Sequence, residues 1–151
     1  MITKRKKILR WLLLLLWLAV IFIMSQEPGD ISSSQSDFIV NLISFTGIEL
    51  NDYYMEIATL VVRKSAHFTE YSILFILVYR VIILYMNKKQ AKIVAILFVF
   101  GYACSDEFHQ YFIQGREAAF RDVIIDTSGG IMGSFIMMIV EKIKFKNRKS
   151  T

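Results

Sequence analysis

The chain has 151 residues, of which 55% are hydrophobic, and it carries a net charge of +5. The length fits a single domain, and a mean hydropathy of +0.47 is too high for an ordinary soluble one. Its single cysteine excludes an internal disulfide and a cysteine cage for a metal. No nucleic-acid partner is expected, because the basic residues are grouped where membrane insertion would put them.

Four apolar segments approach the ~20 residues that cross a hydrocarbon core of ~30 Å. We therefore expect an all-α membrane protein, a four-transmembrane-helix bundle forming one domain over residues 1–151. Its membrane helices are predicted at about 8–25, 65–86, 91–112 and 122–141. The first helix is expected to stay uncleaved, because no small-x-small signal-peptide site follows it. The apolar stretch 93–104 reaches only about 18 Å, so its helix must continue through the polar residues beyond it.

The sign of the charges alternates along the chain. Basic residues cluster before the first predicted helix, between the second and third, and after the fourth, whereas the first connection is mainly acidic. Cytoplasmic segments of membrane proteins collect lysine and arginine. The pattern predicts a multi-pass protein of the cell membrane with both termini in the cytoplasm.

A further, short amphipathic helix is predicted in the first extracellular connection. There the apolar residues follow a helical stripe, formed by Phe38, Ile39, Leu42, Ile43 and Phe45. Two placements remain open: the helix lies along the outer membrane surface, or it packs on the bundle. A new helix start is expected at Asn51 or Asp52, running without interruption into the second membrane helix.

Polar segments of three predicted helices should meet near the outer side of the bilayer. They are the start of the second helix, the end of the third and the start of the fourth. Ionisable groups at membrane depth cost several kcal/mol unless they are paired or hydrated, so they face the bundle interior and mark a functional site. The alternative is a structural network of ion pairs. In the fourth helix, Gly129 and Gly133 have the small-xxx-small spacing that lets a neighbouring backbone approach closely.

Two kinds of ligand fit these residues. The i, i+3 pairs His67/Glu70 and Asp106/His109 are typical of metal sites in helical bundles, and they suit a zinc-like or manganese-like ion. The same four residues are the candidate catalytic set of a membrane-embedded metal-dependent hydrolase or transferase. The second ligand is an anion at the outward helix N-termini, with a lipid phosphate as the obvious one at that depth. The candidate anion-binding residues are Arg63, Lys64, Gln110, Arg116 and Asp122. The sequence assures no cofactor, and no serine stands out as a nucleophile.

Several motifs together resemble the VanZ-like membrane proteins, a family named for a factor associated with resistance to the glycopeptide teicoplanin. They are Arg63-Lys64-x-x-His67-Phe68-x-Glu70-Tyr71, Asp106-Glu107-x-His109-Gln110, Gly115-Arg116 and Asp122-Val123-x-x-Asp126-x-x-Gly129-x-x-x-Gly133. The resemblance implies a small helical membrane domain that reduces drug action at the cell envelope. Our leading hypothesis is a pocket for a lipid-linked or phosphate-bearing cell-wall component. Asp126 departs from the family pattern, which has Asn at this position.

Overall fold

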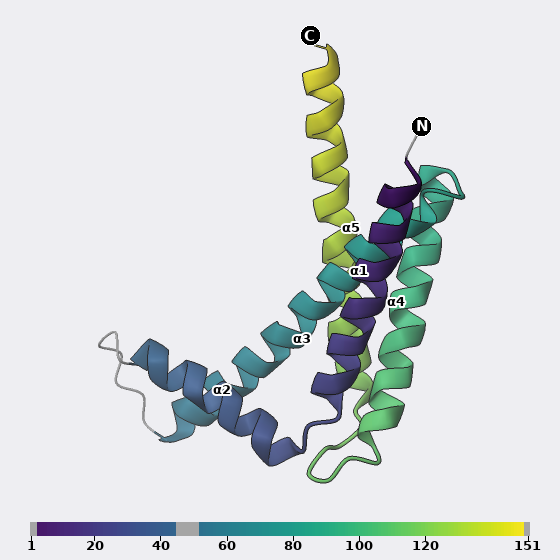
Figure 1. Cartoon of the computed structure of the whole chain (residues 1–151). Coiled ribbons are helices and arrows are strands. Elements are labelled where there is room, and N and C mark those ends of the chain that lie inside the picture. Colours follow the sequence, from purple (N-terminus) through teal and green to yellow (C-terminus); the bar gives the residue numbers. More distant parts are fainter. Residues whose placement is uncertain (1–2, 45–51, 150–151) are drawn as a thin grey trace.

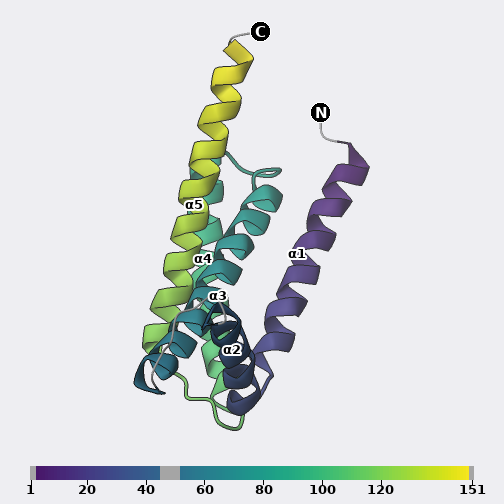
Figure 2. The ribbon, with the colours of Figure 1, turned by 90° about the vertical axis from the view of Figure 1, so that its left-hand side faces the viewer.

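A computed structural model describes residues 3–44 and 52–149 of the chain. The described residues form five α-helices, which are α1 (Lys4–Ser25), α2 (Gly29–Ser44), α3 (Asp52–Ile82), α4 (Lys88–Gln110) and α5 (Phe120–Lys149). The start of α1 and the end of α5 lie at one end of the molecule (Figure 1, Figure 2). Helix α2 and the connection 111–119 lie at the opposite end, which we call the α2 end.

The all-α class is confirmed for the described residues, and the helices overlap all four predicted membrane segments. Helix α3 begins at Asp52, as expected, so it is longer than the segment 65–86. Helix α4 begins behind Asn87, whose side chain caps it by accepting a hydrogen bond of 3.0 Å from the backbone N–H of Gln90. It ends at Gln110, two residues before the predicted bound.

Two of the described helices are long and apolar enough to cross a membrane by length and composition. They are α1 and residues 120–147 of α5. Helices α3 and α4 do not meet this criterion, and each carries ionisable residues within it, such as Glu70 and Arg80 in α3 and Asp106 and Glu107 in α4. A bundle of four membrane-crossing helices therefore stays a prediction.

The amphipathic helix of the first connection is present and starts earlier than the stripe of apolar residues suggested. The serines of its first half remain helical, with the hydroxyl of Ser33 donating to the carbonyl of Gly29, one turn earlier, at 2.8 Å. Val40 is buried where α2 packs on α3, whereas Phe38 is 70% and Leu42 62% exposed. The packing on the bundle is confirmed, and the exposed apolar stripe leaves the placement along the outer membrane surface a prediction. Phe45 lies outside the described residues.

The closest helix packing joins α3 to α5 through two glycines. A Cβ atom added to Gly129 would overlap the carbonyl oxygen of Phe68, and one added to Gly133 would lie 2.5 Å from that of Ser72. The Ser72 hydroxyl also donates to the carbonyl of Gly129 at 2.7 Å. The predicted close approach along the small-xxx-small spacing is confirmed.

Helix α1 is fastened to its neighbours by side chains that donate to backbone carbonyls. Trp17 Nε1 donates to the carbonyl of Glu70 at 3.0 Å, and the hydroxyl of Tyr102 donates to that of Leu18 at 3.0 Å. On its core-facing side, α4 carries a row of small buried residues, which are Ala91, Ala95, Val99 and Ala103. The helices thus deliver the ends of α1, α3, α4 and α5 to one place at the α2 end.

Candidate functional site

The connection 111–119 docks on the corner between α1 and α2. The backbone N–H of Gly29 donates to the carbonyl of Gln114 at 3.1 Å. A Cβ atom at Gly29 would overlap the Gly115 carbonyl, and Gly115 itself has a φ of +72°, which L side chains rarely adopt. Glycine at both positions lets the two backbones touch. This contact brings the next residue, Arg116, into the interior of the α2 end.

Arg116 holds this corner together. Its side chain donates to the carbonyl of Glu27 at 3.0 Å, to that of Met24 at 3.4 Å and to the side chain of Gln110 at 3.4 Å. The residue is only 8% exposed, and burial, together with the neighbouring Arg63, lowers the pKa of the Arg116 guanidinium. Its donors are directed at α1, α4 and the α1–α2 corner, so Arg116 is foremost a structural cation.

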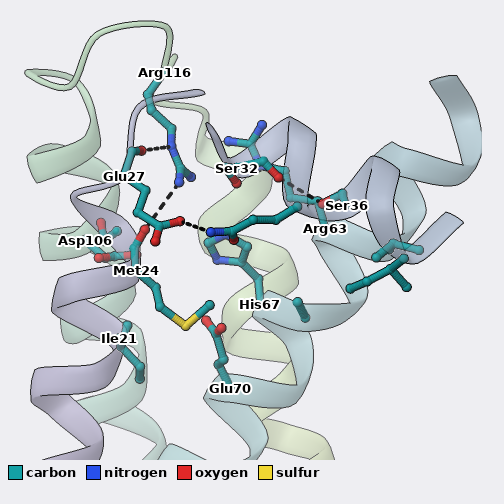
Figure 3. A pocket seen from close by; sticks show the side chains of 15 residues that line it. Ile21, Met24, Glu27, Ser32, Ser36, Arg63, His67, Glu70, Asp106 and Arg116 are labelled. Carbon is teal, nitrogen blue, oxygen red and sulfur yellow. Dashed lines mark hydrogen bonds between the residues drawn. The ribbon is translucent and has the colours of Figure 1, made fainter. Parts of the chain in front are cut away.

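A cavity of about 120 Å³ lies behind this corner, between the ends of α1, α2, α3 and α4 (Figure 3). Its ionisable lining residues are Glu27, Arg63, His67, Glu70, Asp106 and Arg116. One buried water needs roughly 10–15 Å³, so the cavity has room for several waters or a small polar group. It is well below the roughly 300–1,000 Å³ of sites that enclose drug-sized ligands. A larger ligand could place only its polar head here.

A second hollow, of about 480 Å³, lies beside the first and is lined by several basic residues. We call it the basic depression, and its charged residues are Arg63, Lys64, Arg116, Glu117, Arg121 and Asp122. Lys64 is paired with Asp122. Arg63 lines both the cavity and the basic depression, and its buried Nε has no hydrogen-bond partner among the described residues. Arg63 is therefore the cation at this end that is best placed to receive an anion.

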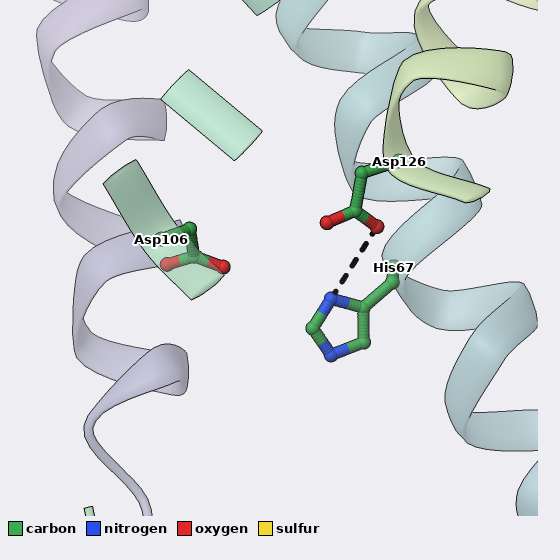
Figure 4. Close-up of side chains that lie close together, drawn as sticks. All are labelled: His67, Asp106 and Asp126. Atoms are coloured by element: carbon green, nitrogen blue, oxygen red, sulfur yellow. Dashed lines mark ion pairs between the residues drawn. The ribbon is translucent and has the colours of Figure 1, made fainter. Parts of the chain in front are cut away.

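The cavity meets a cluster of one histidine and two carboxylates, each from a different helix (Figure 4). His67 comes from α3, Asp106 from α4 and Asp126 from α5, and one ligand atom of each lies within 4.8 Å of the other two. Nδ1 of His67 is 3.7 Å from Oδ1 of Asp126. Asp106 is 6% and Asp126 only 1% exposed. The Asp106 carboxylate accepts a hydrogen bond of 3.1 Å from Gln110.

The structure does not bring the four predicted metal ligands into one group. His67 and Asp106 meet, and Glu70 lines the same cavity outside the cluster. His109 instead stacks at a tilt on Phe22 of α1, with a ring-centroid distance of 5.2 Å, and lines a different hollow. Asp106 and His109 share one side of α4 and both line this hollow, but only Asp106 also reaches the cavity and the cluster.

Two residues gained roles that spacing alone did not assign. Asp126 was not among the predicted metal or anion ligands, although it completes the buried cluster. Its position one turn after Asp122 in a largely apolar stretch was the available signal. Glu107 is buried and accepts the backbone N–H of Ala119 at 2.9 Å, which holds the entry into α5. Of the predicted anion-binding residues, Arg63, Lys64, Arg116 and Asp122 line the basic depression, and Gln110 is buried beside Arg116.

Comparison with known families identifies the chain. The family model VanZ/LLP1 matches residues 10–141, which is most of the sequence. The chain belongs to the VanZ/LLP1 family. No curated protein and no solved structure matches it. The resemblance inferred from the motifs is thus confirmed, and in this VanZ/LLP1 protein the motif residues His67, Asp106 and Asp126 converge in one buried cluster.

Proposed function

We propose that this VanZ/LLP1 protein is a multi-pass membrane protein of the cell envelope. In the proposal its α2 end binds a phosphate-bearing envelope lipid or lipid-linked cell-wall precursor, and this binding lowers susceptibility to glycopeptides of the teicoplanin type. The observation that carries the proposal is Arg63, a half-buried cation between the cavity and the basic depression, whose buried Nε has no hydrogen-bond partner among the described residues. Family membership supports the envelope role.

The outer surface of the helices supports a lipid environment. Large apolar side chains are strongly exposed along the bundle, including Leu16 at 64%, Leu97 at 63% and Phe135 at 52%. A water-soluble protein rarely exposes contiguous apolar patches of this kind. The start of α1, the turn between α3 and α4 and the end of α5 are basic and lie at one end, opposite the α2 end (Figure 1). That arrangement favours cytoplasmic termini and an outward-facing α2 end.

The size and charge of the site favour a phosphate head group. The cavity admits a small polar group but not a whole glycopeptide or precursor, so most of the ligand would remain outside it. A guanidinium presents several donors in a planar fork that matches phosphate oxygens. Phe38, Leu42 and Leu60, all exposed near this end, would contact the ligand's hydrocarbon part.

A binding experiment tests the proposal with a matched pair of arginines on α3. Arg63→Gln removes the cation at the site, and Arg80→Gln removes an exposed cation 17 residues later, about 25 Å along the helix. Detergent-solubilised protein would be titrated with phosphatidic acid and with diacylglycerol of the same chains, and bound lipid counted by native mass spectrometry. We expect phosphate-dependent binding in the wild type and in Arg80→Gln, and at least a tenfold loss in Arg63→Gln. Equal binding by all three proteins would refute the site.

A susceptibility experiment tests the consequence in cells. The wild-type protein and the two variants would be expressed at matched membrane levels in a teicoplanin-susceptible host. The proposal expects the inhibitory concentration to rise with the wild type and with Arg80→Gln, and to stay at the host value with Arg63→Gln. No rise with the wild type would contradict the role in resistance, while leaving lipid binding to the first experiment.

The structure favours a binding site over the four-residue catalytic set of a metal-dependent hydrolase or transferase. That enzyme would need His67, Glu70, Asp106 and His109 to converge on one reacting group. His109 lies against Phe22 and lines a hollow that it shares with Asp106 but not with His67 or Glu70. A metal can still bind at this end, but with another set of ligands.

A further inference from the structure

We propose that His67, Asp106 and Asp126 bind a divalent metal ion. This ligand set differs from the one that helical spacing suggests, because Asp126 takes part and Glu70 and His109 do not. The inference goes beyond the proposed function and does not depend on it. It starts from the three helices that deliver one ligand atom each to within 4.8 Å of the others (Figure 4).

The decisive observation is the state of Asp126. It is 1% exposed, and neither of its carboxylate oxygens has a hydrogen-bond partner among the described residues. Nδ1 of His67 lies 3.7 Å from Oδ1 of Asp126, which is beyond hydrogen-bonding distance. A buried carboxylate without partners is strongly destabilising, and such groups in proteins are paired or coordinate metals. Figure 4 shows this carboxylate directed toward His67 and toward the side of the cluster where Asp106 lies.

Neighbouring hydroxyls support a bound ion at the same place. The hydroxyls of Ser25 and Tyr71 are buried without hydrogen-bond partners among the described residues, and both lie near Asp106. Small rotations would let them donate to Asp106, and Gln110 already donates to it at 3.1 Å. Outer donors of this kind orient a ligating carboxylate. The cluster therefore has candidate metal ligands and, around Asp106, candidate hydrogen-bond donors that would orient that ligand.

The distances suit a divalent ion after a small contraction. Metal–ligand bonds of ~2.1 Å place ligand atoms roughly 3–3.5 Å apart. The His67–Asp126 separation of 3.7 Å is close to this range, and the widest separation allowed by the 4.8 Å limit needs a side-chain shift of about 1 Å. One imidazole and two carboxylates favour zinc or manganese over calcium, which takes six to eight oxygen ligands. The adjoining cavity leaves room for water or for a phosphate oxygen as a further ligand.

The metal content of the full chain tests the proposal without any lipid. Detergent-solubilised wild type would be equilibrated with Zn²⁺ or Mn²⁺, desalted and analysed by inductively coupled plasma mass spectrometry. We expect about one ion per chain, at least a tenfold loss in His67→Ala and Asp126→Ala, and full retention in Glu70→Gln and His109→Ala. These controls are another carboxylate of the cavity and the other histidine of the chain.

A measurement on the wild type keeps the proposal falsifiable if a cluster variant does not fold. Titration with Co²⁺ should produce visible d–d absorption that saturates at one equivalent and disappears with excess Zn²⁺. Absence of both the retained ion and the Co²⁺ spectrum would overturn the site. Loss of metal in Glu70→Gln or His109→Ala to the same extent as in His67→Ala would overturn this ligand set. Lipid binding that persists in metal-free protein would leave the proposed function intact.

Discussion

Replacing Gly133 by alanine should separate α3 from α5. The new Cβ atom would lie 2.5 Å from the carbonyl oxygen of Ser72 and 3.0 Å from Cβ of Phe75. A relaxed C···O contact is about 3.3 Å, so the backbones must move apart by roughly 0.8 Å. Overpacking of this kind costs about 1–3 kcal/mol. Weakening the hydrogen bond from Ser72 to the carbonyl of Gly129 adds about 0.5–1.5 kcal/mol.

Gly101 of α4 provides the matched control, because a Cβ atom added there meets nothing within 4 Å. Both substitutions gain up to about 1 kcal/mol of helix propensity, so their difference isolates the steric contribution. We expect Gly133→Ala to be less stable than Gly101→Ala by about 1.5–4.5 kcal/mol, the sum of the two costs above. The unfolding free energy would be measured by denaturant titration in mixed micelles, followed by far-UV circular dichroism. Equal stability of the two variants would refute the close approach of α3 and α5.

Four substitutions probe other parts of the molecule, three by the same stability measurement and one by association with lipid vesicles. Arg116→Ala should lower the unfolding free energy by about 2–4 kcal/mol, because three hydrogen bonds from one buried cation disappear. Arg63→Gln should leave stability unchanged or higher, since the Arg63 Nε has no hydrogen-bond partner among the described residues. Equal losses in the two variants would contradict the division between a structural and a free cation. Tyr79→Phe should cost about 1 kcal/mol by removing the hydrogen bond to Glu141, with lipid and metal binding at the other end unaffected. Phe38→Glu should leave helix content unchanged and weaken association with lipid vesicles, because Phe38 is 70% exposed on α2. Undiminished association in a flotation assay would count against the lipid contact of this helix.

The sequence predicted the features that depend on local pattern. The spacing of Gly129 and Gly133 indicated a close helix contact, and the structure shows carbonyl oxygens where Cβ atoms would have to fit. The helix start at Asp52 was also expected. The early start of α2 was harder to predict, because serines near Pro28 normally indicate a loop. Here a hydroxyl such as that of Ser33 bonds back to the preceding turn, and α3 supplies the packing.

The set of metal ligands was less predictable, because helical spacing gives the direction of a side chain but not the neighbouring helix that it meets. Asp106 and His109 lie on one side of α4, and α4 contacts α1 as well as α3 and α5. A rotation of about 60° separates their directions, since each residue advances the helix by ~100°. That angle turns His109 to Phe22 of α1 and leaves Asp106 facing the cluster with Asp126. Only the order of the helices around α4 decides between these surroundings.

The ionisable residues of the α2 end divide into two groups by their hydrogen bonds. Arg116 donates to backbone carbonyls and one oxygen of Glu107 accepts a backbone N–H, so both hold the connection 111–119 in place. Among the described residues, Arg63 Nε and both carboxylate oxygens of Asp126 have no hydrogen-bond partner. In a medium where an unpaired buried charge is expensive, the first group lowers the free energy of the folded chain, and the second group raises it until a ligand binds. The free energy released by a ligand should therefore come mainly from Arg63 and Asp126, one suited to an anion and the other to a cation.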